Sequence, residues 1–281
     1  NPSWSWRKFS CVITKGGIKM AAIFLNSLRL NWRSALFTGL GLAVVATLFS
    51  GLFEHFKGQL GTFVGSMPEG MNAIIGDVAA ATTPEGWLGL ELFPLLVPVT
   101  LATLAVTLGA GLIGKEEDSG TLEMILAGKR SRLNIAWQKF LALAMLTALP
   151  AGLVFAAIWL GALIFEFSPN LWHVAAACFS GWALGLAHGG ISFAVQAVTG
   201  KRGLAIAVGA SIFAASYVLS VICKLIDNWK DYDIYSTMYY YNIPGTLQDG
   251  IDWGRLAVLG AIALICLLVA MLGFSRRDTG K

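Results

Sequence analysis

The run from Gly109 to Lys115 has the glycine spacing with which many proteins bind phosphate. It fits the pattern G-x-G-x-x-G and also the first seven positions of a P-loop. A P-loop continues with Ser or Thr to bind Mg²⁺, whereas Glu116 follows here. The run also ends a long apolar segment, where the negative end of a helix dipole would oppose phosphate. We therefore expect this chain to bind no nucleotide and no other cofactor.

His188 and four cysteines are the other side chains with catalytic or metal-binding chemistry. Ser180 precedes His188 by eight residues, about 12 Å along a helix, which is too far for a nucleophile–base hydrogen bond. We expect His188 to form a hydrogen bond between helices instead. The cysteines have no C-x-x-C spacing and lie at Cys11, Cys178, Cys223 and Cys266. The sequence thus predicts no catalytic residue and no metal site.

Six long apolar segments must position these side chains. Each segment reaches the roughly 20 residues that a helix needs to cross a bilayer, and none contains Asp, Glu, Lys or Arg. Their unbroken length excludes barrel strands. We therefore predict an all-α integral membrane protein, with one domain over residues 20–281. The expected helices are about 34–53, 92–114, 140–165, 171–200, 203–223 and 256–275.

The distribution of charge predicts the orientation. With the N-terminus inside, the inner segments from residue 20 onward hold twelve Lys and Arg residues and the outer segments hold four. The positive-inside rule therefore favours both termini in the cytoplasm. We expect the protein in the plasma or inner membrane of a prokaryote. The net charge of +4 suits anionic inner-leaflet lipid, so we expect no nucleic-acid partner.

The N-terminal region divides at Met20. Residues 1–19 fit the rest poorly, and Lys15 to Gly17 could be encoded by a purine-rich ribosome-binding stretch. We expect residues 1–19 to be non-native or an over-extended reading frame. From Met20 to Arg33, apolar residues gather on one helical face, which predicts an amphipathic helix in the cytoplasmic interface.

Two outer loops connect the predicted helices. The first, residues 54–91, has turn signals at Pro68 to Gly70 and at Pro84 to Gly86. The second, residues 224–255, is rich in aromatic residues: Trp229, Tyr232, Tyr235, Tyr239, Tyr240, Tyr241 and Trp253. These residues fit an interfacial aromatic belt, and a lid that contacts substrate is the alternative.

Small residues recur at four-residue spacing in two predicted helices. Such stripes allow two helices to approach closely, either within one chain or between two copies. The residues are Gly181, Gly185 and Gly189 in the first stripe, and Gly203, Ala207, Ser211 and Ala215 in the second.

The segment from Lys115 to Lys139 is the sizeable polar stretch on the predicted cytoplasmic face. A short helix is expected from about Ser119 to Gly128, with an apolar ridge of Leu122, Ile125 and Leu126. The ridge could rest on the inner leaflet or dock on a cytoplasmic partner. The predicted spanning helices lack the charged midplane residues that couple transport to an ion gradient. Another protein would then have to supply the energy.

The stretch from Glu116 to Leu126, followed by Ser131-Arg132 and Lys139, resembles the loop between the second and third helices of type-2 ABC exporter permeases. That loop follows the pattern E-x-x-x-G-T-L-E, then leucines, S-R and a lysine. The six-helix layout and the ending Phe274 to Asp278 are also similar to the family.

This resemblance implies a permease that works beside a second permease copy or a paralogue, with two copies of a separate ATPase that hold ATP and Mg²⁺. Gly120–Ala127 would be the coupling helix that docks on the ATPase. The implied contact residues are Glu116, Glu117, Gly120, Thr121, Leu122, Glu123, Ile125, Leu126 and Arg132. The alternative is a structural or regulatory membrane subunit that recruits a cytoplasmic partner without moving substrate.

Overall fold

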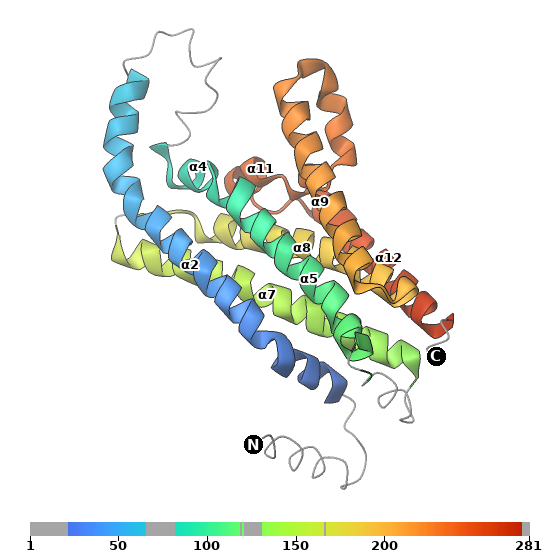
Figure 1. Cartoon of the computed structure of the whole chain (residues 1–281). Helices are drawn as coiled ribbons and strands as arrows, with labels where there is room; N and C mark the ends of the chain where they lie inside the picture. The colour runs from blue at the N-terminus through green and yellow to red at the C-terminus, as the bar shows by residue number, and fades with distance from the viewer. Residues whose placement is uncertain (1–21, 66–81, 119, 121–130, 166, 277–281) are drawn as a thin grey trace.

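The structure is a computed structural model that describes residues 22–65, 82–118, 120, 131–165 and 167–276. These residues form helices and connections without a strand (Figure 1). Six helical segments are long and apolar enough to cross a membrane, which confirms the predicted fold class. The long helices are α2 (Ala22–Gly65), α5 (Val97–Asp118), α7 (Arg132–Ile164), α8 (Leu171–Thr199), α9 (Arg202–Leu225) and α12 (Trp253–Arg276). The predicted extension, residues 1–19, lies outside the described residues.

Side-chain caps and one glycine fix several helix ends. Ser131 accepts a hydrogen bond from the Asn134 amide at 3.3 Å and so caps the start of α7. Asn170 caps α8 in the same way, through the Trp172 amide at 3.1 Å. At the other end of α8, Gly200 has φ 66°, a left-handed conformation that a residue without Cβ adopts at low cost. The chain therefore turns within two residues before α9 begins.

Helix α2 is longer than the sequence predicted. It runs without interruption from Ala22 to Gly65, through the proposed interfacial helix and into the proposed first outer loop. No proline interrupts this run, and Glu54 and Lys57 form an ion pair at 3.5 Å on the additional turns. In its first turns the polar residues Ser27 and Asn31 are buried against the bundle, whereas Trp32 is 44% exposed. Placement of these first turns at the membrane surface stays a prediction.

The segment before α5 contains two short helices. Residues Pro84–Leu88 form α4, where the sequence predicted a simple turn, because Thr83 caps the helix and Pro84 occupies its first position. Leu92–Leu96 form η2, a π-helical turn that contains Pro94. This irregularity lies where the prolines predicted a kink, since Pro94 cannot donate a helical hydrogen bond.

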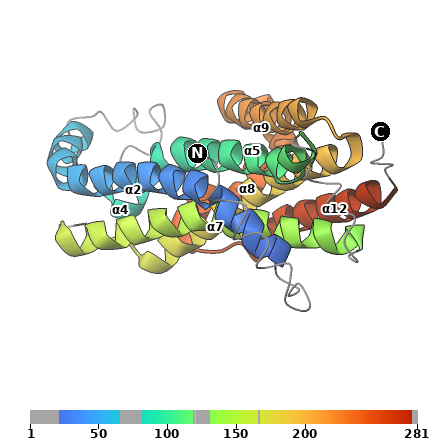
Figure 2. The same cartoon turned by 60° about the horizontal axis from the view of Figure 1, so that its bottom comes forward.

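Helices α5 and α8 form the centre of the bundle (Figure 2). The first small-residue stripe faces α5: a Cβ added at Gly189 would lie 2.9 Å from the Ala105 carbonyl oxygen. A Cβ at Gly109 would in turn strike the Gly189 carbonyl oxygen and lie 3.1 Å from the Phe193 amide nitrogen. Gly109, which begins the phosphate-like pattern, therefore lies inside α5, where it allows α5 and α8 to approach closely.

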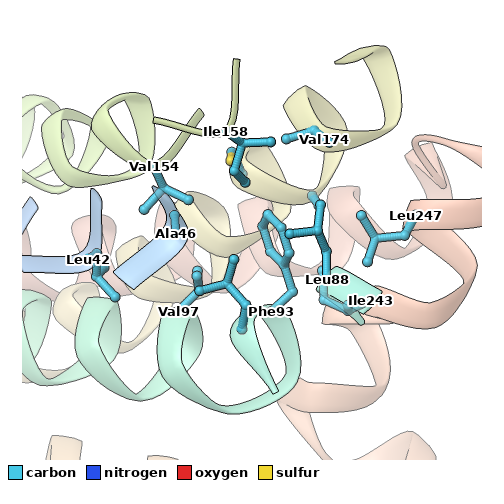
Figure 3. Close-up of a cluster of buried hydrophobic side chains, with 14 of the residues drawn as sticks. Leu42, Ala46, Leu88, Phe93, Val97, Val154, Ile158, Val174, Ile243 and Leu247 are labelled. Carbon is cyan, nitrogen blue, oxygen red and sulfur yellow. The ribbon is translucent and has the colours of Figure 1, made fainter. Parts of the chain in front are cut away.

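A large apolar cluster packs the opposite end of the bundle from the α5–α7 connection. It joins side chains of α2, α4, η2, α5, α7, α8 and α11 (Ile243–Asp249), as Figure 3 shows. The labelled members are Leu42, Ala46, Leu88, Phe93, Val97, Val154, Ile158, Val174, Ile243 and Leu247. Burial of these side chains holds the short helices against the long ones.

The aromatic loop folds into the bundle rather than lying along its edge. After α9 the chain forms η3 (Asp227–Tyr235), which runs back beside α9, and then α10 (Thr237–Tyr241) and α11 (Figure 1). Tyr241 is 1% exposed and donates a hydrogen bond to the Phe93 carbonyl oxygen at 2.8 Å. Other aromatic residues of the loop are exposed, as an interfacial belt requires: Trp229, Tyr232, Tyr235 and Trp253. The loop therefore has an exposed aromatic part and a part inserted among the helices.

Candidate functional site

The last turn of α5 carries four consecutive charged residues, Lys115 to Asp118, which we call the hub. Each hub side chain contacts a different helix. Lys115 reaches α2, where its Nζ donates a hydrogen bond to Asn31 Oδ1 at 3.0 Å. Successive residues of a helix point about 100° apart, so four adjacent charged side chains can contact several neighbouring helices.

Glu116 forms an ion pair with Lys139 of α7. Lys139 Nζ lies 2.6 Å from Glu116 Oε2 and also donates to the Leu112 carbonyl oxygen at 2.5 Å. Lys139 is fully buried because α7 begins at Arg132, which places Lys139 two turns inside the helix and against α5. A buried ammonium requires such compensation, so this contact fixes α7 to the end of α5.

The next two hub residues contact α8 and α9. Glu117 Oε2 accepts a hydrogen bond from Gln196 Nε2 of α8 at 3.2 Å. Asp118 lies 3.9 Å from the Arg202 guanidinium at the start of α9, and both side chains are more than a third exposed. An exposed pair of this kind contributes little stability. The hub is therefore held firmly to α7 and loosely to α9.

Arg132 completes the set of contacts from the other side of the α5–α7 connection. Its guanidinium donates to the Phe274 carbonyl oxygen at 3.4 Å, near the end of α12, where helix carbonyls lack intrahelical partners. The hub and Arg132 thus flank residues 119–131 and together contact α2, α7, α8, α9 and α12. With α5 itself, these contacts join all six long helices at one end of the bundle.

Four of the nine predicted docking residues lie within the described part of the chain: Glu116, Glu117, Gly120 and Arg132. Glu116 and Glu117 face neighbouring helices, and Gly120 adopts φ 69° just after α5. Thr121, Leu122, Glu123, Ile125 and Leu126 lie outside the described residues. Sequence reasoning missed the partners Asn31, Lys139, Gln196 and Arg202. Polar Asn31 and Gln196 within apolar stretches were the available signal for two of them.

His188 and the second small-residue stripe are not among the residues that contact the hub. The predicted hydrogen bond between helices is confirmed, since His188 Nε2 lies 3.0 Å from Thr237 Oγ1 of α10. The stripe on α9 has no close neighbour among the described residues. A Cβ at Gly203 would meet nothing within 4 Å, and the other stripe members are exposed: Ala207, Ser211 and Ala215.

Six apolar helices joined at one charged end define a multi-pass membrane protein. Residues 21–279 match the family model described as ABC-2 family transporter protein, which covers nearly the whole chain. The chain belongs to the ABC-2 transporter family and is a permease subunit, a membrane component of transport. No curated protein matched the sequence.

Proposed function

We propose that this chain is the membrane-spanning permease of an ATP-driven exporter in a prokaryotic inner membrane, with both termini in the cytoplasm. The observation that carries the proposal is the set of contacts made by the hub and Arg132, which flank residues 119–131 in the sequence and reach all six long helices. A separate ATPase, in two copies that bind ATP and Mg²⁺, would press on Gly120–Ala127. The permease would then convert that movement into alternating access of its pathway.

The strengths of the hub contacts suggest which helices move. The buried Lys139–Glu116 pair would make α7 follow α5, because separating it would leave a charge without a partner inside the protein. The half-exposed Arg202–Asp118 pair can open at low cost, since water replaces each partner. Movement of the α5 end would therefore shift α9 relative to α8 more readily than it would separate α5 from α7.

A second permease copy would complete the transporter. Helix α9 presents its small-residue stripe outward, from Gly203 to Ala215, and this surface leaves room for close approach by another helix. Membrane lipid would cover the remaining apolar surfaces. Pairing through α9 would place the helix with the loosest hub contact next to the other subunit.

Affinity recovery from native membranes tests the proposal. Replacing Leu122 and Leu126 by Asp, or Glu123 by Lys, should abolish recovery of an ATPase and should abolish transport, because the apolar ridge and its charge would no longer fit the partner. Glu54→Lys reverses a charge at the other end of α2 and serves as the control. Membrane insertion, measured by the amount of protein in the membrane fraction, should be the same for all variants. Unchanged ATPase recovery with both loop variants would refute the docking role.

A further inference from the structure

Buried polar atoms without a hydrogen-bond partner are confined to one part of the described structure. They belong to side chains of α8, α9 and η3: His188 Nδ1, Gln196 Oε1, Arg202 Nε, Ser220 Oγ and Asp233 Oδ1. Elsewhere in the described bundle, buried hydroxyl groups such as Ser50 and Thr147 donate to their own helix. A buried polar atom without a partner is unfavourable, so its concentration between two helices needs an explanation.

Four of these atoms, all except Arg202 Nε, belong to a longer row of polar side chains, which we call the seam. Its members are His188, Ser192 and Gln196 of α8, Ser216 and Ser220 of α9, and Asp233, Ser236 and Thr237. Contacts join the row across the helices. Ser236 Oγ donates to the Ser216 carbonyl oxygen at 2.7 Å, and Ser192 Oγ donates to the Ala205 carbonyl oxygen at 2.8 Å.

The seam extends over most of the length of α9. Ala205 and Ser220 are fifteen residues apart, which is about 22 Å along a helix and most of a hydrocarbon core. At one end Gln196 donates to Glu117 of the hub, and at the other end Asp233 lies on η3. His188 lies between these ends. It contacts Thr237 and packs perpendicular to the Phe213 ring, with 5.1 Å between the ring centroids.

The seam's chemistry selects the kind of molecule that could occupy it. Between Asp233 and Glu117 the side chains are hydroxyls, an amide and an imidazole, with both donors and acceptors. A fully apolar guest would leave these atoms without partners. A strongly charged guest would find no buried counter-charge along the middle of the row.

We propose that the seam binds the uncharged, hydrogen-bonding part of an amphiphilic substrate while its apolar part stays along α9. The outer side of α9, which would face the second copy in the proposed transporter, is apolar and exposed in one subunit, as an acyl chain requires, at Leu204, Ile212, Val218 and Val221. His188, Ser192 and Gln196 are fully buried, so the seam opens when α9 moves away from α8. The inference rests on the proposed function, in which the hub drives that movement through the Arg202–Asp118 contact.

Cysteine labelling in the ATPase complex tests the seam. In a background with all four native cysteines replaced by Ala, Ser192→Cys and Ser220→Cys should react with N-ethylmaleimide during ATP turnover. Ser50→Cys is the matched control, because Ser50 is also fully buried but lies between α2 and α7. Dodecyl glucoside should slow labelling of the two seam cysteines, whereas dodecyl sulfate and dodecyltrimethylammonium, with the same alkyl chain, should not.

A second variant tests the role of His188 without cysteine substitution. His188→Leu should weaken dodecyl glucoside binding about ten-fold, the loss of one buried hydrogen bond, and His188→Gln should restore most of it. Binding is measured with radiolabelled dodecyl glucoside on the complex in nanodiscs. An unaltered affinity in His188→Leu would overturn the proposal.

The labelling outcomes separate this inference from the proposed function. A complex that hydrolyses ATP while the seam cysteines stay as unreactive as Ser50→Cys retains the exporter function and overturns the seam. Labelling that no amphiphile slows means that the seam holds water alone, and equal protection by all three amphiphiles means that the alkyl chain binds instead. Each of these results overturns the inference. Failure to recover an ATPase counts against the proposed function, and the nanodisc binding test can still be made on the permease alone.

Discussion

The ammonium group of Lys139 lies 2.6 Å from the carboxylate of Glu116, and this contact joins the second turn of α7 to the last turn of α5. The two residues flank the segment that we propose to contact an ATPase. Lys139 is fully buried, whereas the Glu116 side chain is 15% exposed. Separating the pair would therefore leave the Lys139 ammonium without a counter-charge inside the protein. Helices α5 and α7 should therefore move as one unit.

Substitutions in this pair should have unequal effects. Glu116→Gln leaves the fully buried Lys139 without a counter-charge and should cost about 3 kcal/mol of stability, whereas Lys139→Met leaves a partly hydrated Glu116 and should cost less. Thermal unfolding in detergent measures both. The double variant should be more stable than Glu116→Gln alone. If the two single effects simply add, the side chains do not interact energetically.

Removing the Glu117–Gln196 hydrogen bond should uncouple transport from ATP hydrolysis. We expect Glu117→Ala to retain the ATPase in an affinity purification while transport falls, because the variant removes the contact of Glu117 with α8. Gln196→Ala removes the other side of the same bond and should give the same result.

The variants Glu117→Ala and Gln196→Ala also show whether Glu117 acts through its contact with α8 or through a direct contact with the ATPase. If Glu117 contacts the ATPase directly, as the family resemblance implies, Glu117→Ala should lose the partner and Gln196→Ala should keep it. Quantitative recovery of the ATPase with each variant distinguishes these outcomes.

The crossing of α5 and α8 should tolerate no side chain at Gly109. A methyl group there strikes the Gly189 carbonyl, so Gly109→Ala should lower the melting temperature. Gly152 of α7 has open space around its Cβ position, and Gly152→Ala should be neutral or stabilising by roughly 0.5 kcal/mol, through helix propensity. A stable Gly109→Ala variant would contradict the close crossing.

The inserted part of the aromatic loop should be sensitive to the loss of one hydroxyl. Tyr241→Phe leaves the buried Phe93 carbonyl without its donor and should destabilise the protein by about 1 kcal/mol. Tyr235→Phe is the control, since Tyr235 is 77% exposed. Equal melting temperatures for the two variants would place Tyr241 outside the bundle.

Composition and periodicity predicted the six helices because long apolar runs without charge have few alternatives in a membrane. Their ends were harder to predict. The sequence placed the third crossing from residue 140, but α7 begins at Arg132 and carries Lys139 into the interior. In a sequence, a lysine beside an apolar run indicates the end of the membrane segment, because the carboxylate that would allow its burial cannot be identified. Glu116 lies 23 residues earlier, so only the tertiary structure shows the pair.

The sequence identified charged residues of the hub but did not predict the side chains that they contact. The family pattern assigned Glu116 and Glu117 to an ATPase contact, which stays a prediction. The structure adds that both residues have partners on neighbouring helices. That Gly109–Lys115 binds no nucleotide stays a prediction. In the structure, Gly109 lies within α5 and packs closely against α8. Which side chain a residue meets across a bundle depends on helix rotation, which hydropathy does not determine.

The most direct test of the hub measures helix movement in the complex with its ATPase. Spin labels at Arg33 of α2 and Leu204 of α9, both exposed near the hub, report the distance between these helices with and without ATP. We predict that ATP changes this distance in the wild-type protein. In the variant Glu117→Ala with Asp118→Ala, the change should disappear while the ATPase remains bound. An equal change in both proteins would contradict transmission through the hub.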